Sequence, residues 1–312
     1  MKSLQINSDA FNAILIDFTN DLRIRNYNPK AVYNNPNHIR EFLHYLEAKG
    51  HENLAGVTTK LVTAYYKYLS TRKNLTRGGA LSNSSLNKHQ NALHQFLSYL
   101  KNNGAKINFG VHLKNEKPNT IDVKDILTQK ETLDLFDACE YSHVSQRFRL
   151  RDKAILVVLY SCGLRRNEAV GLNISDVDFD KRQLYIRNGS RNKRREIPYV
   201  SVNNFNLQIL KEYLENARPQ FYLADQSEAL FINKNGGSLK GMSFANRLSA
   251  IVKASENEAI IEKKISPHNL RHSVATHLLQ NGMPIEKVKE FLGHKSLEST
   301  QIYVHIIEQL DA

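Results

Sequence analysis

Four side chains that suit phosphate chemistry gather near the end of the sequence. His268 and Arg271 stand three residues apart, directly after Ser266-Pro267, a pair that favours a helix start with serine as the N-cap. Residues three apart share a helix face, and a helix N-terminus offers free N–H groups, so this turn suits an anion. His294 follows a helix-ending glycine, and Tyr303 lies nine residues further on. Because a deprotonated phenol is both a good nucleophile and a good leaving group, the stretch predicts chemistry on a phosphate ester.

A second stretch supplies another arginine in a setting that can fix its side chain. Gly163 ends an apolar helix, and Arg165 falls in the tight connection to the next one. Glu168 lies one turn further on, where its carboxylate could orient the guanidinium. A planar pair of N–H donors matches the oxygens of a phosphate.

Each of these residues also has an ordinary structural interpretation. Arg165 alone could form a core ion pair with Glu168, and Tyr303 alone could be a buried tyrosine. His268 and His272 stand four apart, as zinc ligands on a helix do, but no His-Glu-x-x-His motif is present and neither cysteine is near in sequence. The sequence therefore predicts no metal site, and the functional interpretation depends on the residues occurring together.

Their order and spacing resemble those of the tyrosine recombinase (phage integrase) family. The matching boxes are Gly163-Leu164-Arg165 with Glu168, then His268-x-x-Arg271, then Leu292-Gly293-His294, then Tyr303. The resemblance covers roughly residues 125 to 307. The first hundred residues resemble the family's helical core-binding domain by position and character only. We expect the chain to begin at that domain, which favours a Xer-like or transposon-type enzyme.

The resemblance implies a role for each residue. Tyr303 is expected to attack a backbone phosphorus, leaving a 3′-phosphotyrosine and a free 5′-hydroxyl. Arg165 and Arg271 would meet the charge on the non-bridging oxygens, and His294 would donate to the phosphate. His268 would be a hydrogen-bond partner of Tyr303 and could accept its proton. Since the covalent link stores the broken bond and arginines bear the charge, no cofactor, ATP or metal is expected.

The sequence departs from the family at the lysine of a β-hairpin turn, which donates a proton to the departing 5′-oxygen. When this turn is aligned with the family's pattern through the neighbouring residues, Ser190 occupies the position of the usual lysine. The serine hydroxyl is a poor acid. Lys193 is the only lysine in the turn and is our choice, with Arg191 as the rival. An arginine hardly gives up its proton, which disfavours Arg191. A role of Lys193 in contacting phosphates or solvent stays open.

The elements that must position these residues can be read from the hydrophobic pattern. Apolar residues at helical spacing predict four or five helices in the first hundred residues. In the second half we expect a helix capped by Thr128 with Glu131 as its capping-box partner, a helix over 151–160, and strands over 184–187, 196–200 and 230–233. The predicted fold is mainly α with a small β-sheet. The domains are a helical core-binding (SAM-like) domain over 1–110, a linker over 111–124 and a mixed α/β catalytic domain over 125–312.

Composition is consistent with this scheme. Lys and Arg number 43 against 31 Asp and Glu, which favours a polyanionic partner such as nucleic acid. Two cysteines in 312 residues make no disulfide framework, and the polar N-terminus is no signal peptide. No apolar run is long enough to cross a bilayer, so we expect no membrane partner and a cytoplasmic, nucleoid-associated protein.

The expected partner is double-stranded DNA, with a homo-tetramer on paired recombination sites and a partner recombinase as a further possibility. Two other functions stay open at this point. One is a strand relaxer of the type IB topoisomerase kind, which shares the chemistry but needs no paired sites. The other is a catalytically weak or inactive DNA-binding relative, suggested by Ser190 at the position of the usual lysine.

Overall fold

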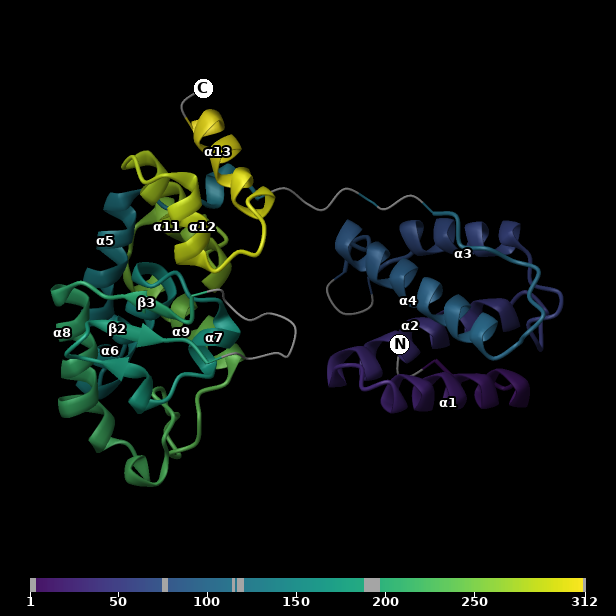
Figure 1. Ribbon diagram of the computed structural model, residues 1–312, viewed down its shortest axis with the longest axis horizontal. Coiled ribbons are helices and arrows are strands. Elements are labelled where there is room, and N and C mark those ends of the chain that lie inside the picture. Colours follow the sequence, from purple (N-terminus) through teal and green to yellow (C-terminus); the bar gives the residue numbers. More distant parts are fainter. Residues whose placement is uncertain (1–3, 75–77, 114–115, 117–120, 188–196, 311–312) are drawn as a thin grey trace. The chain divides into compact units, whose positions relative to one another are not determined.

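The chain forms two compact units, Met1–Thr120 and Ile121–Ala312. The computed structural model describes residues 4–74, 78–113, 116, 121–187 and 197–310 (Figure 1). The described chain is mainly helical with one small sheet, which confirms the predicted fold class. In the described residues, no helix is long and apolar enough to cross a membrane.

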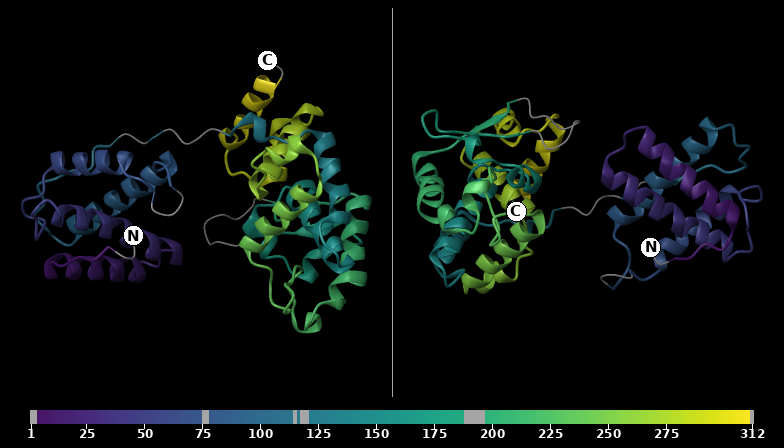
Figure 2. Two further views of the ribbon diagram at one scale, coloured as in Figure 1. Left: turned by 180° about the vertical axis from the view of Figure 1, so that it is seen from behind. Right: turned by 90° about the horizontal axis from the view of Figure 1, so that it is seen from below.

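The first unit is a bundle of four helices, each begun by a polar side chain that caps it. Ser8, Asn28, Thr58 and Ser82 each accept a hydrogen bond from a backbone N–H of the first turn. Phe18, Phe42, Tyr65 and Phe96 are fully buried at its centre. The helices are α1 (Asp9–Ile24), α2 (Pro29–Glu47), α3 (Thr59–Thr71) and α4 (Asn83–Asn102) (Figure 2).

The segment that follows α4 packs back on the same bundle. Val111, which the sequence analysis places in the linker, is buried in the first core. The backbone N–H of Gly110 donates to Thr59 Oγ1 at 2.9 Å. Asn87 exchanges two hydrogen bonds with the backbone of Glu116, at 2.8 and 2.9 Å. These contacts join residues 109–113 and Glu116 to the first unit.

The second unit surrounds a larger core with helices and a three-stranded antiparallel sheet. The sheet has the order β1 (Val177–Asp178), β2 (Gln183–Tyr185), β3 (Tyr199–Ser201), with Leu184 paired to Val177 on one side and to Val200 on the other. The α-helices are α5 (Gln129–Ala138), α6 (Gln146–Leu156), α7 (Arg166–Val170), α8 (Asn204–Glu212), α9 (Gly241–Ala254), α10 (Glu258–Ile261), α11 (Pro267–Gln280), α12 (Ile285–Leu292) and α13 (Glu298–Leu310). Short single turns join them: η1 (Val123–Asp125), η2 (Cys139–Tyr141), η3 (Val157–Ser161), η4 (Ile174–Asp176), η5 (Tyr213–Ala217), η6 (Arg218–Gln220) and η7 (Ala224–Gln226).

Some predicted elements differ from the structure. The pairing of β2 with β3 confirms the predicted hairpin strands, while its turn lies outside the described residues. The strand predicted over 230–233 is wrong, because Ile232 makes only a single bridge, to Ser238. The helix predicted over 151–160 begins earlier, at Gln146, and its last turn is the wider π-type turn η3. Polar residues at the start of α6 hid its first turn from the apolar pattern.

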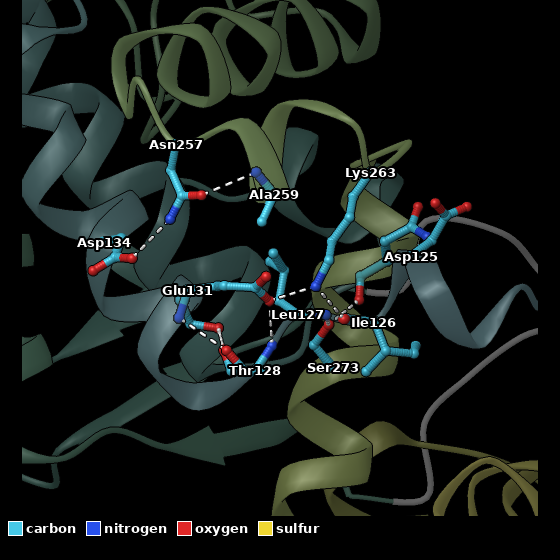
Figure 3. A network of polar contacts seen from close by, with 12 residues as sticks. Asp125, Ile126, Leu127, Thr128, Glu131, Asp134, Asn257, Ala259, Lys263 and Ser273 are labelled. Carbon is cyan, nitrogen blue, oxygen red and sulfur yellow. Dashed lines mark hydrogen bonds and ion pairs between the residues drawn. The ribbon is translucent and has the colours of Figure 1, made fainter. Parts of the chain in front are cut away.

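A polar network ties the start of the second unit to α11 (Figure 3). Thr128 and Glu131 form the predicted capping box of α5. The ammonium of Lys263 donates to the backbone oxygen of Ile126 at 3.0 Å and pairs with Glu131. The backbone N–H of Leu127 donates to Ser273 Oγ at 2.9 Å, in the middle of α11. This network fixes α11, the helix that carries His268 and Arg271.

Candidate active site

The first turn of α11 presents His268 and Arg271 as the sequence predicts. Ser266 is the N-cap and Pro267 the first helical residue. The Ser266 side chain accepts from the backbone N–H of Asn269, and Asn269 in turn bonds back to Ser266. This reciprocal cap sets the direction in which the helix starts.

The guanidinium of Arg271 links two distant turns of the chain. The Arg271 residue is 3% exposed, and its guanidinium donates to the backbone oxygens of Gly163 and Leu292, the latter at 2.5 Å. Leu292 is the last residue of α12, and Gly163 follows η3. The last carbonyls of a helix lack partners within it and carry partial negative charge, so a cation satisfies them.

Arg165 is held beside the same helix end and remains more open. Its Nη1 donates to Glu168 Oε1 at 2.9 Å, and its backbone N–H donates to Glu168 Oε2 at 2.8 Å. Its Nη2 donates to the backbone oxygen of Gly293 at 3.3 Å. The side chain is 32% exposed, so a ligand can reach it. These bonds confirm that Glu168 orients Arg165.

Two glycines shape the turns that receive these arginines. Gly163 has φ +57° and Gly293 has φ +62°, in the left-handed region that glycine occupies without strain. A Cβ at Gly163 would lie 2.7 Å from Cε1 of Phe291, on α12. Close packing at Gly163 therefore brings the Arg165 turn against the end of α12.

Tyr303 lies in a small core formed by α11, α12 and α13. It is 2% exposed and packs with Ala275, Val288 and Leu292. Its ring is nearly parallel to that of His294, with centroids 6.3 Å apart. Burial raises the pKa of Tyr303, and the positive charges of Arg271 and Arg165 oppose that shift. Both arginines therefore act electrostatically on this phenol.

The hydroxyl of Tyr303 is hydrogen-bonded to His272, and not to His268 as the family resemblance implied. His272 Nδ1 lies 3.0 Å from Tyr303 Oη. Within the described part of the chain, no hydrogen bond joins His268 to Tyr303. His272 stands one turn beyond His268, at the spacing considered above for zinc. The four-residue spacing places His272 on the same helix face as His268, and this was the only indication of its role in the sequence. The packing of α11 against α13 determines which of the two histidines contacts Tyr303.

His268 lies instead among the arginines. Burial lowers its pKa, as do the charges of Arg166, Arg271 and Arg165. Arg166, which the sequence analysis did not select, packs against the first residue of α9, since a Cβ at Gly241 would lie 3.2 Å from its Nε. Its Nε is buried with no hydrogen-bond partner among the described residues. Two consecutive arginines, Arg165-Arg166, were the signal in the sequence.

His294 and the hairpin lysine complete the list of expected residues. His294 follows the left-handed Gly293, and its Nδ1 lies 2.9 Å from Thr300 Oγ1, on α13. Lys193, its rival Arg191 and Ser190 lie outside the described residues. Among the residues that are described, no group of three or more His, Cys, Asp or Glu is placed to hold a metal ion.

Two arginines, three histidines and a buried tyrosine thus lie around the end of α12, within a unit of helices and one small sheet. Residues 125–309 match the model of the phage integrase family, and the chain belongs to this family. Tyrosine recombinase XerD of Corynebacterium glutamicum is 34% identical over 274 residues, covering 86% of this chain and 84% of that protein. Tyrosine recombinase XerC of Bacillus subtilis is 31% identical over 299 residues, covering 92% of this chain and 89% of that protein.

Solved structures share the fold. The XerH site-specific recombinase in a post-cleavage complex with palindromic difH substrate has a TM-score of 0.71 at 19% identity, covering 98% of this chain and 96% of that one. A lambda integrase dimer bound to a COC′ core site has a TM-score of 0.67 at 18% identity, covering 94% of this chain and 76% of that one. At these identities the likeness shows the fold alone.

Proposed function

We propose that this member of the phage integrase family is a site-specific DNA recombinase that cuts and rejoins double-stranded DNA through Tyr303. The observation that carries the proposal is the position of Tyr303. Its hydroxyl lies beside His272, and its phenol is under the electrostatic influence of both Arg165 and Arg271. Positive groups fixed before the substrate binds stabilise the charge that develops as a phosphate is attacked.

The reaction follows from these groups. The Tyr303 hydroxyl loses its proton to water as its oxygen forms a bond to phosphorus, the bond to the 5′-oxygen breaks with its electron pair, and a 3′-phosphotyrosine results. The departing oxygen takes a proton, for which Lys193 is the proposed donor. Attack by a 5′-hydroxyl on the phosphotyrosine reverses these steps and releases the phenol. The number of phosphoester bonds is unchanged, so rejoining needs no external energy source.

The histidines of the site have separate proposed roles. Burial and neighbouring arginines lower the pKa of His268, so it is neutral near pH 7 and donates a single N–H. We assign this donor to the phosphate, in place of the expected bond to Tyr303. His294, at the turn that also receives Arg165, is assigned to the same phosphate.

The charge distribution supports DNA as the partner. Residues 1–120 contain 16 Lys and Arg against 7 Asp and Glu, whereas residues 121–312 contain 27 against 24. The first unit thus carries +9 of the net charge of +12, an excess that suits a unit that binds the DNA backbone. Cleavage of paired sites implies a homo-tetramer, with or without a second recombinase. We place this activity on DNA in the cytoplasm.

Covalent trapping on DNA tests the proposal. The target sequence is found first, by sequencing DNA fragments that stay attached to the protein after denaturation. A duplex of that sequence, nicked next to the cleavage site so that the released end diffuses away, should then accumulate an adduct. Tyr303→Phe should form none, while Tyr222→Phe, which changes an exposed tyrosine, should behave like the wild type.

The same assay separates the alternatives. Absence of any adduct with the wild-type chain, at sites that it binds, would favour the inactive DNA-binding relative suggested by Ser190. Adduct formation with relaxation of a supercoiled plasmid, but without exchange between two sites, would favour the type IB relaxer. Recombinant products from a two-site plasmid would support the recombinase.

A further inference from the structure

The Tyr303 hydroxyl has one hydrogen-bond partner within the described part of the chain. That partner is Nδ1 of His272, at 3.0 Å, and the two ring centroids are 5.6 Å apart. His272 belongs to α11 and Tyr303 to α13, and these helices pack together. The contact therefore joins the nucleophile to the helix that carries Arg271.

Packing fixes the Tyr303 ring and leaves the hydroxyl hydrogen as its movable part. The ring is enclosed by apolar side chains of α11, α12 and α13, including Ala275, Leu292 and Ile306. A hydroxyl hydrogen rotates to suit its neighbours. The group that accepts this hydrogen decides which way the oxygen lone pairs point.

His272 can accept that hydrogen. Burial and the charges of His268 and Arg271 lower the pKa of His272 to about 4, so the ring is neutral near pH 7. A neutral imidazole has one N–H and one acceptor nitrogen. With the hydrogen on Nε2, Nδ1 accepts from the phenol and leaves both lone pairs of the Tyr303 oxygen free of the histidine. With the hydrogen on Nδ1, the histidine would instead occupy one of those lone pairs.

We propose that His272 is a positioning residue for Tyr303, holding its hydroxyl by accepting a hydrogen bond at Nδ1 and so aiming the oxygen at the scissile phosphate. The inference rests on the proposed function, since it assigns a role within the same reaction. It adds a group that the sequence pattern of the site does not include. In this proposal His272 orients the Tyr303 hydroxyl, while the arginines stabilise the negative charge of the phosphate.

Three substitutions test which atom of His272 matters. Asparagine places an amide near the position of Nδ1, glutamine places one near Nε2, and leucine removes both. On the nicked duplex, His272→Leu should lower the rate of adduct formation about 100-fold, the effect of misplacing a reacting group by about 1 Å. His272→Asn should form the adduct at least tenfold faster than His272→Leu, whereas His272→Gln should be no faster than His272→Leu. The matched control is His305→Leu, because His305 lies on the same helix as Tyr303 but is exposed.

A spectroscopic measurement tests the direction of the hydrogen bond independently of activity. Histidine labelled with ¹⁵N in the ring is incorporated into the full chain, and the His272 signals are identified by their loss in His272→Asn. We expect the shift of an unprotonated nitrogen at Nδ1 and of a protonated one at Nε2. This readout applies even if His272→Leu does not fold.

The outcomes separate this inference from the proposed function. No Tyr303-dependent adduct in the wild type would overturn the function, whatever the histidine variants do. Wild-type adducts formed at an unchanged rate by folded His272→Leu would overturn the positioning role alone. A protonated Nδ1, or equal rates for the asparagine and glutamine variants, would also overturn it.

Discussion

The two arginines of the site differ in how the protein holds them. Arg271 is buried and bonded to backbone oxygens of two turns, so it supports the structure as well as the site. Arg165 is one-third exposed and is held by one carboxylate and one carbonyl. A change at Arg165 therefore tests phosphate chemistry with less disturbance of folding.

We predict that Arg165→Lys slows adduct formation on the nicked duplex by about 10²–10³-fold, the loss that follows removal of one fixed donor from such a site. Lysine keeps the charge but lacks the planar pair of donors. DNA affinity, measured by gel shift at fixed salt, should change by less than about threefold. Arg187→Lys, which alters an ion pair with Asp176, is the control. A rate within about threefold of wild type would remove Arg165 from the reaction.

The sequence predicted side-chain contacts best where the two residues lie within one turn of each other in the chain. Arg165 and Glu168 are three residues apart, and their bond was predictable from the spacing alone. His272 and Tyr303 are 31 residues apart, and their contact depends on how two helices cross. Arg72 illustrates the same limit in the first unit. Its side chain pairs with the buried Glu41, 31 residues away, and no local pattern in the sequence indicates that partner.

At the scale of elements, the turn before α7 controls the position of Arg165. Alanine at position 163 would adopt a strained φ of +57°, and its Cβ would meet Phe291 at 2.7 Å. We expect Gly163→Ala to lower the free energy of unfolding by about 1–3 kcal/mol, from strain at a left-handed position. Urea denaturation measures the loss, and adduct formation should fall with it even where the variant is folded. Gly50→Ala is also strained, at φ +83°, but has open space around it and should leave adduct formation unchanged.

The junction between the start of the second unit and α11 gives another element-scale prediction. Ser273 Oγ is fully buried and accepts the hydrogen bond of the Leu127 backbone N–H. Ser273→Ala leaves that donor unsatisfied, which should reduce the free energy of unfolding by about 1–3 kcal/mol. Ser249→Ala, at an exposed position of α9, should have no such effect. Equal stabilities of the two variants would show that the Leu127 bond contributes nothing measurable.

Helices were predictable because their capping residues and apolar faces are local, as at Thr128 with Glu131 and at Ser266 with Pro267. The small strands were less so. Residues 230–233 have a strand-like composition, but among the described residues they form only a single bridge, from Ile232 to Ser238. Strand β1 has two residues, too few for a periodic signal, and exists through its pairing with β2.

At the scale of the whole molecule, both units bury histidines that are not charged in the folded state. In the first unit, the rings of His38 and His89 lie 4.1 Å apart, near Arg72. Burial lowers the pKa of His38 to about 4 and that of His89 to about 3, with neighbouring positive groups adding to the shift. In the second unit, the pKa of His272 is lowered to about 4.

These shifts predict that the chain loses stability on mild acidification. Above about pH 6.5 neither state binds protons at these histidines, so they make no pH-dependent contribution. As the pH falls below 6.5, the unfolded chain takes up protons that the folded chain cannot, and stability declines until the pH reaches the folded-state pKa values of about 3 to 4. Each such histidine adds a slope of about 1.4 kcal/mol per pH unit within that window.

Urea denaturation at intervals from pH 7.5 to 5.0 measures this slope while the carboxylates remain mostly ionised. His89→Gln removes one of the buried imidazoles and should flatten the decline, whereas the exposed His305→Gln should leave it unchanged. If the two units unfold separately, only the transition of the first unit should respond to His89→Gln, because His89 lies within its core beside Tyr65. Stability that is constant or rises down to pH 5.0 would mean that the folded chain protonates these histidines as readily as the unfolded one, and would remove the argument that His272 is neutral beside Tyr303.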